Sequence, residues 1–164
     1  MESEYMVLLT HGNIFNSTAQ MIVNPVNCAG VMGKGLAKEF KKNYPDMFDS
    51  YQSYCKSNRL FMGSLFIYKC YQTKKPDYIV CFPTKIHWSD ISKYEHIATG
   101  LKALRKTIID LHITSIAMPA LGCGLGQLEF TEIIKLIVDN FVDLKDVKIY
   151  VFKPWEGGKN NVCN

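Results

Sequence analysis

The chain has 164 residues, which is enough for one domain with a substantial core and too few for two. Hydrophobic residues make up 48% of it and charged residues 21%, as in an ordinary globular protein, and no run approaches the roughly 18 apolar residues of a membrane span. The formal net charge of +4 favours anionic ligands mildly and lacks the concentrated charge of a dedicated nucleic-acid binder.

The hydrophobic pattern predicts strands that alternate with helices. Short apolar runs predict strands at residues 6–9, 21–23, 65–71, 78–82, 115–118 and 147–152. Apolar spacings of three and four predict helices from Lys34 to the Tyr44-Pro45 stop, at 46–57, from Ser92 to Leu111, and at 131–141. Helices between strands imply an α/β fold, a three-layer α/β/α sandwich with a mixed, mostly parallel central sheet. We expect one domain over residues 1–156 and a disordered tail over 157–164.

The cysteines and histidines are not spaced like those of a metal site. The six cysteines form no C-x-x-C pair and the four histidines do not cluster near them, so we expect neither a metal nor a cofactor. A chain of this size needs no disulfide scaffold, which favours reduced thiols. The acidic start, Met1 to Glu4, is followed by no signal-peptide core, so we expect a cytoplasmic protein with no membrane partner.

One stretch, Met21 to Phe40, combines a strand, a polar glycine-rich loop at residues 24–33 and a helix. Glycines let a backbone approach a ligand closely, and the first N–H groups of a helix lack internal partners and attract anions. A second glycine loop, residues 119–127, follows the strand at 115–118. Because ligands of open α/β sheets lie beyond the carboxyl ends of the strands, we expect both loops to border one cleft, suited to a diphosphate.

Neither loop matches the better-known phosphate-binding motifs. The run from Gly30 to Gly35 has two residues between its first glycines where a P-loop has four, and Gly35 follows the lysine in place of Ser or Thr. The glycines of residues 122–126 have neither the spacing nor the early position of a Rossmann fingerprint. A plain turn is the alternative for each glycine taken singly, whereas two such loops after two strands favour a ligand site.

Four motifs in this order resemble the macrodomain family. They are Gly12-Asn13-Ile14, Ile22-Val23-Asn24-Pro25-Val26-Asn27, Gly30-Val31-Met32-Gly33-Lys34-Gly35-Leu36-Ala37 and Pro119-Ala120-Leu121-Gly122-Cys123-Gly124-Leu125-Gly126. The resemblance covers about residues 5 to 153, nearly the whole chain. Macrodomains bind ADP-ribose, and many hydrolyse its derivatives.

The run Phe82-Pro83-Thr84-Lys85, with His87-Trp88, is similar to two branches of this family. One is the antitoxin branch that removes ADP-ribose from thymidine in DNA. The other is the human terminal ADP-ribose protein glycohydrolase branch, which removes it from carboxylate side chains and carries Asp where this chain has Gly126. The DNA-directed branch carries Gly there, so the resemblance favours that branch. Glu129 is a carboxylate nearby in sequence.

The resemblance implies a role for each matching residue. Asn13 would contact the adenine amino group, with the Ile14 backbone N–H beside it; Asn keeps an acceptor but loses the charge of the usual Asp. Asn27 would hydrogen-bond the distal ribose and position it for catalysis, and a loop-capping Asn is the alternative. The other residues expected to bind ADP-ribose are Val31, Met32, Gly33, Lys34, Gly35, Pro83, Thr84, Leu121, Gly122, Cys123, Gly124, Leu125 and Gly126.

Lys85 matches the lysine implicated in catalysis in this branch. A lysine at a strand's carboxyl end can attack C1″ of the distal ribose as an amine, or form a Schiff base if the sugar opens. As an ammonium it can instead stabilise developing negative charge. Attack requires a lowered pKa, which partial burial near other lysines would supply. The alternative is a solvated surface lysine.

Three further features each have two interpretations. A Cys–His hydrolase would pair Cys28 or Cys123 with His87, but a small residue beside glycines is the simpler account of either cysteine. Trp88 and His87 are suited to stack on a base or on the ribose, although Trp is as often a packing residue. The lysines of the first long helix would either steer nucleic acid or form a solvated face; they are Lys34, Lys38, Lys41 and Lys42.

The sequence therefore predicts an ADP-ribosyl glycohydrolase that cleaves the bond at C1″ of a mono-ADP-ribosylated target, with thymidine in DNA as the favoured target. The alternatives are an ADP-ribose 1″-phosphate phosphatase and a non-catalytic ADP-ribose reader. The expected partners are ADP-ribose or an ADP-ribosylated macromolecule, and single-stranded DNA. We expect a monomer, because no exposed apolar stripe demands a partner.

Overall fold

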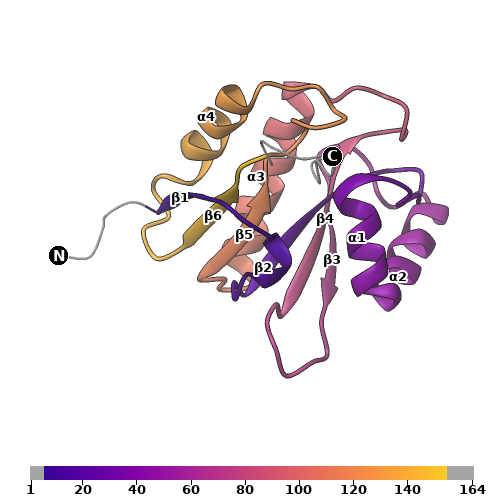
Figure 1. Cartoon of the computed structure of the whole chain (residues 1–164), viewed down its shortest axis with the longest axis horizontal. Coiled ribbons are helices and arrows are strands. Elements are labelled where there is room, and N and C mark those ends of the chain that lie inside the picture. The colour runs from indigo at the N-terminus through magenta and orange to yellow at the C-terminus, as the bar shows by residue number, and fades with distance from the viewer. Residues whose placement is uncertain (1–5, 155–164) are drawn as a thin grey trace.

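The computed structural model describes residues 6–154, which form a six-stranded sheet in the order β1-β6-β5-β2-β4-β3 (Figure 1). The strands are β1 (Val7–Thr10), β2 (Met21–Asn27), β3 (Phe66–Lys69), β4 (Tyr78–Lys85), β5 (Ser115–Pro119) and β6 (Lys148–Phe152). All neighbouring strands are parallel except β3, which pairs antiparallel with β4 at one edge. The expected mixed, mostly parallel sheet is confirmed. The tail predicted at residues 157–164 lies outside the described residues.

Two pairs of helices cover the two faces of the sheet. The helices are α1 (Gly35–Asn43), α2 (Pro45–Lys56), α3 (Tyr94–Asp110) and α4 (Phe130–Phe141), with a short 3-10 helix η1 (Ile14–Asn16) after β1. Alternate strand residues face opposite sides, so Met21 and Val23 pack with α3 and α4 while Ile22 and Val26 pack with α1 and α2. The predicted α/β/α sandwich is confirmed, with a hydrophobic core in each of its two interfaces.

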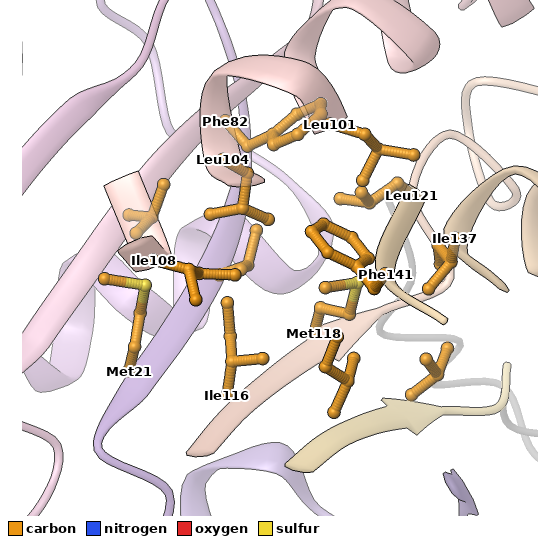
Figure 2. Packing of buried hydrophobic residues seen from close by; sticks show 14 of the residues in the cluster. Met21, Phe82, Leu101, Leu104, Ile108, Ile116, Met118, Leu121, Ile137 and Phe141 are labelled. Carbon is orange, nitrogen blue, oxygen red and sulfur yellow. The ribbon is translucent and has the colours of Figure 1, made fainter. Parts of the chain in front are cut away.

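The core beneath α3 and α4 is closely packed. Figure 2 shows Leu101, Leu104 and Ile108 of α3 gathered with strand residues around Phe141 of α4. Gly100 lies where α3 crosses Phe82, and a Cβ atom at Gly100 would overlap the Phe82 ring. The glycine therefore lets α3 lie against β4, the strand that ends at Lys85.

Strands β2 and β4 continue beyond the ends predicted from sequence. The sequence predicts a polar, glycine-rich loop from Asn24 and a strand that ends at residue 82, so Asn24 to Asn27 and Pro83 to Lys85 are additional strand residues. In the structure β5 pairs with β2 only at Met21 and Ile22, and β3 pairs with β4 only as far as Cys81. Each proline therefore lies in a segment whose second side has no strand partner, so its missing N–H breaks no ladder there.

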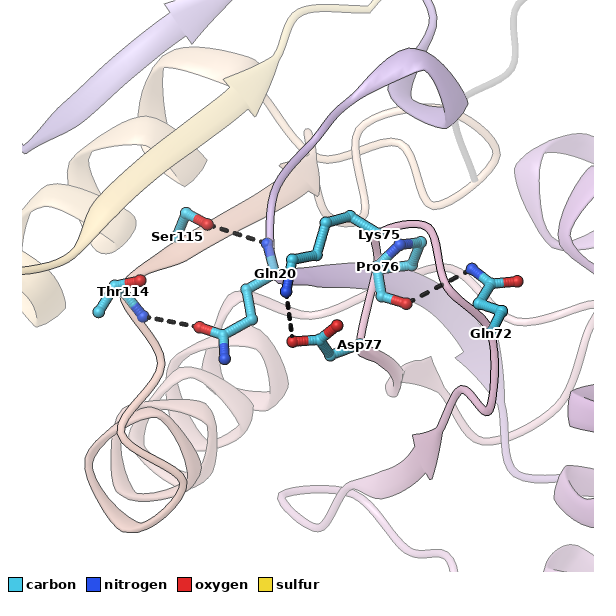
Figure 3. A network of polar contacts seen from close by, with 7 residues as sticks. All are labelled: Gln20, Gln72, Lys75, Pro76, Asp77, Thr114 and Ser115. Atoms are coloured by element: carbon cyan, nitrogen blue, oxygen red, sulfur yellow. Dashed lines mark hydrogen bonds and ion pairs between the residues drawn. The ribbon is translucent and has the colours of Figure 1, made fainter.

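The amino ends of three strands are tied together by Gln20, as Figure 3 shows in part. The Gln20 N–H donates to Ser115 Oγ at 2.9 Å, and its side-chain oxygen accepts from the Thr114 N–H at 3.1 Å. Its carbonyl accepts from the N–H groups of Asp77 and Tyr78 at the start of β4. Polar contacts join the strands at this end of the sheet, and the opposite, carboxyl end carries the glycine loops. None of the helices between residues 6 and 154 is long and apolar enough to cross a membrane.

Candidate functional site

A cleft of about 470 Å³ lies at the carboxyl ends of β2 and β4. Because β2 lies between β5 and β4 and all three strands are parallel, the segments that follow them meet at one edge of the sheet. The residues that line the cleft are Pro25, Val26, Asn27, Val31, Gly33, Lys34, Ala37, Thr84, Lys85, Trp88, Ser89, Asp90, Ile91, Leu125 and Gln127. The expected meeting of both glycine loops at one cleft is present, through Val31, Gly33 and Lys34 on one side and Leu125 and Gln127 on the other.

The side chain of Asn27 organises the loop that follows β2. Its Oδ1 accepts from the Ala29 N–H at 3.0 Å and the Val31 N–H at 3.4 Å, and its Nδ2 donates to the Val31 carbonyl at 2.9 Å. Tyr51 of α2 is fully buried, and its hydroxyl donates toward Asn27. The hydroxyl oxygen lies 2.7 Å from the Asn27 carbonyl oxygen and 3.1 Å from Asn27 Oδ1. Asn27 is thus a loop-capping residue, and the described contacts use only one of its two amide hydrogens.

A β-bulge brings Asn27 directly opposite Lys85. Val26 pairs with Pro83 and Asn27 pairs with Lys85, so Thr84 is an additional residue on β4. Bulges re-aim side chains and are common beside active sites. The pairing continues one step further, since the Cys28 N–H donates to the Ile86 carbonyl at 2.9 Å. The two residues predicted as catalytic are therefore neighbours across two strands.

Lys85 is buried in the floor of the cleft, with 9% of its surface exposed. Burial lowers the pKa of its ammonium group, because a desolvated charge is unfavourable, and the positive charge of Lys34 lowers that pKa further. The Asp90 carboxylate acts in the opposite direction. The alternative of a solvated surface lysine is wrong, and the net lowering enlarges the fraction of neutral amine at a given pH.

Asp90 is the carboxylate that lines this cleft, and sequence reasoning had considered Glu129 instead. Asp90 Oδ2 accepts from the His87 N–H at 2.9 Å and the Asp90 N–H donates to the His87 carbonyl at 3.1 Å, which closes a tight turn after β4. An Asp three residues after a His forms no recognisable sequence motif, so the sequence did not single out Asp90. The turn that brings it back toward Lys85 forms only in the folded loop.

Close contacts hold the second loop. A Cβ atom at Gly126 would lie 2.6 Å from the Gly122 carbonyl oxygen and would overlap Ser92 Oγ. The Ser92 N–H donates to the Gly126 carbonyl at 3.0 Å, while Ser92 Oγ is buried with no hydrogen-bond partner in the described residues. Gly122 has φ of +75°, which favours glycine. An Asp in place of Gly126 does not fit this packing.

Several predicted binding residues do not line this cleft; they are Asn13, Ile14, Met32, Gly35, Pro83, Leu121, Gly122, Cys123, Gly124 and Gly126. Asn13 caps η1 by accepting from the Phe15 N–H at 2.9 Å, so its acceptor already has one donor. Met32 and Pro83 are buried, and Gly35 begins α1. The glycines of the second loop support Leu125 and Gln127, which do line it.

Sequence reasoning missed Pro25, Val26, Ala37, Ser89, Asp90, Ile91 and Gln127 as cleft residues. Pro25, Val26 and Ala37 lie within the motifs named above, and Ser89 and Gln127 directly follow Trp88 and Gly126, so for these five the signal was position in or beside a motif. Asp90 and Ile91 adjoin no selected residue and gave no such signal. The Cys–His hydrolase interpretation finds little support, because burial raises the pKa of the Cys28 thiol to about 11. The His87 ring contacts Ser89 Oγ at 2.9 Å and lies beside the Trp88 ring at a tilted angle.

The fold is that of a macrodomain, and the chain belongs to the macro domain family, whose model matches residues 23–137. It is 38% identical over 154 residues to a protein of Mycobacterium tuberculosis named DNA ADP-ribosyl glycohydrolase. That match covers 94% of this chain and 44% of the relative, so the chain spans less than half of that protein's length.

Two solved structures and a human protein extend the comparison. The macrodomain of Mycobacterium tuberculosis DarG superposes with a TM-score of 0.90 at 38% identity, over 92% of this chain and 99% of that one. Thermosipho africanus DarTG in complex with ADP-ribose gives 0.84 at 32% identity, over 92% of this chain and 43% of that one. Human ADP-ribose glycohydrolase OARD1 is 28% identical over 121 residues, 74% of this chain and 73% of the human protein.

Proposed function

We propose that this chain is an ADP-ribosyl glycohydrolase that releases mono-ADP-ribose from a modified target, and that the favoured target is thymidine in DNA. The observation that carries the proposal is the buried Lys85, which pairs across the sheet with Asn27 in the floor of the cleft. The relatives named as DNA ADP-ribosyl glycohydrolases support the choice of target, since their identity of 38% exceeds the 28% of OARD1.

The proposed chemistry uses Lys85 as an amine. Its Nζ lone pair attacks C1″ of the distal ribose, a C–N bond forms, and the bond from C1″ to the target breaks with its electron pair on the target atom. Water then attacks C1″, the C–N bond breaks with its electron pair returning to Lys85 Nζ, and the proton lost by the water goes to the target atom. The lowered pKa of Lys85 supports this role, because attack needs the neutral amine.

Asn27 and the loop glycines orient the substrate in this proposal. The remaining amide hydrogen of Asn27 is directed to the distal ribose, while its other polar atoms hold residues 29–31. The backbone of the second loop at Leu125 and Gln127, which line the cleft, receives the diphosphate. Binding energy from the diphosphate then holds C1″ near Lys85 and contributes to catalysis through orientation.

The test is release of ADP-ribose from single-stranded DNA that carries ADP-ribosylated thymidine. We expect release by the wild type and a loss of at least roughly a hundredfold in Lys85→Ala, because the nucleophile is removed. Lys148→Ala is the control, since this exposed lysine lies at the amino end of β6, away from the cleft. Calorimetry with ADP-ribose shows whether each variant still binds.

Two results would redirect the assignment. Binding of ADP-ribose without release from DNA by the wild type overturns the DNA target and leaves the phosphatase and reader alternatives to be assayed, the first with ADP-ribose 1″-phosphate. Equal release by wild type and Lys85→Ala overturns the role of Lys85. Cytoplasmic location and a monomeric state stay predictions.

A further inference from the structure

Much of the exposed lining of the cleft is apolar, although Lys34, Lys85 and Asp90 give the cleft charge as well. Four large hydrophobic side chains line the cleft and are nevertheless exposed: Val31 at 43%, Trp88 at 54%, Ile91 at 59% and Leu125 at 51%. Exposed apolar groups collected at one concave site mark a surface that binds something. Trp88 is the aromatic residue among these four, and it follows Lys85 by three residues.

The turn that carries Trp88 is held before any ligand binds. The Asp90 carboxylate and backbone N–H both bond to His87, and the His87 ring contacts Ser89 Oγ. The His87 ring also lies against Trp88, with ring centroids 5.3 Å apart at an angle of 38°. A fixed turn presents the indole with little loss of entropy on binding, which is how aromatic side chains serve as recognition groups.

We propose that Trp88 is a specificity-determining residue that stacks on the nucleobase attached to C1″, the group that leaves when ADP-ribose is released. The inference rests on the proposed function and deepens it by naming what reads the target. A base bonded to C1″ beside Lys85 lies within the same cleft as the exposed indole face. Base–aromatic stacking is sequence-tolerant and needs only two flat faces, which an aliphatic carboxylate side chain lacks.

Positively charged side chains next to the cleft are suited to bind the nucleic-acid strand on either side of that base. Lys34 lines the cleft, Lys38 follows one turn later on α1, and both are exposed. Neither forms an ion pair within residues 6–154. Such lysines are suited to bind the negatively charged phosphates on either side of the modified nucleotide. Contacts to these phosphates would position the base over the exposed apolar side chains of the cleft.

The experiment compares wild type, Trp88→Ala and Trp88→Phe on single-stranded DNA that carries ADP-ribosylated thymidine, with calorimetry on free ADP-ribose. Loss of stacking is expected to raise KM for the DNA by roughly 5-fold to 100-fold in Trp88→Ala. Trp88→Phe should recover most of the loss, and the affinity for ADP-ribose should change less than about twofold, because free ADP-ribose has no base at C1″. Tyr71→Ala is the matched control, since Tyr71 is 87% exposed and does not line the cleft.

The outcomes separate this inference from the proposed function. Unchanged KM in Trp88→Ala with an active wild type overturns the stacking role alone. A parallel loss of ADP-ribose affinity in Trp88→Ala also overturns it, because the indole would then contact ADP-ribose itself. An inactive wild type overturns the proposed function, and with it the target that this inference names.

Discussion

The two glycine loops at the cleft look alike in sequence but are held in place by different interactions. The loop after β2, residues 28–34, is held by side-chain hydrogen bonds from Asn27, which Tyr51 supports in turn. The loop after β5, residues 120–129, is held by close packing, with Gly126 against Ser92 and the Gly122 backbone. A Cβ atom at Gly33 in the first loop would meet only ordinary contact, 3.7 Å from Val31.

The difference shows that a glycine-rich motif does not have one physical meaning. In the first loop, Gly33 leaves the wall of the cleft open to a ligand, and the shape of the loop depends on hydrogen bonds. In the second loop, Gly126 is required by the protein itself, because its carbonyl accepts from the Ser92 N–H at 3.0 Å and leaves no room for a side chain. Substitutions in the two loops should therefore have different costs.

The largest expected effect is that of Gly126→Ala. The new methyl group meets the Gly122 backbone as well as Ser92, so we expect a loss of about 3 kcal/mol, the upper end for overpacking, and weaker ADP-ribose binding. Chemical denaturation measures the stability and calorimetry measures the binding. Gly33→Ala is the control and should cost no more than about 0.5 kcal/mol. Equal costs at both positions would contradict the distinction between the loops.

A smaller effect is expected for Tyr51→Phe. This change removes the hydroxyl that donates to Asn27 and leaves a buried carbonyl without that donor, at a cost of about 1 to 2 kcal/mol. Because Asn27 holds the first loop and faces Lys85, kcat/KM for release of ADP-ribose should fall as well. Tyr54→Phe on the same helix keeps its ring contact with Phe66 and should be near neutral. If Tyr51→Phe is as stable and active as Tyr54→Phe, the first loop does not depend on this contact.

The smallest expected change is a shift in pH dependence, and of the two glycine loops only the first contributes a charge to it. The positive charge of Lys34 lowers the pKa of Lys85, so Lys34→Gln should raise that pKa. If the neutral amine is the reactive form, the rate rises with pH through the pKa of Lys85, and this rise should move to higher pH in Lys34→Gln. Asp90→Asn should move it to lower pH, because Asp90 raises the same pKa.

Profiles of kcat/KM against pH measure these shifts. Lys148→Gln is the control, since Lys148 is exposed at the amino end of β6 and does not line the cleft. Gly126→Ala should change the height of the profile without moving it, because the second loop carries no charge that acts on Lys85. Shifts of the same sign in Lys34→Gln and Asp90→Asn would contradict the electrostatic account.

Local patterns in the sequence were sufficient for the element order, the sandwich and the neighbourhood of the site. The apolar run of β2 and the helical spacing of α3 each depend on neighbouring residues, and so they can be read from one segment at a time. The extension of β2 through Pro25 could not be read in this way. It depends on where β5 stops pairing, which is a property of another strand.

The sequence by itself determined which residue types lie at the strand ends: a lysine, an asparagine and two glycine loops. Only the tertiary structure decided how they act together. The bulge at Thr84 sets Lys85 opposite Asn27, the turn at residues 87–90 brings Asp90 to the cleft, and Ser92 closes on Gly126. The physical reason is that burial, charge proximity and close packing depend on distances between segments far apart in the chain, which no local pattern contains.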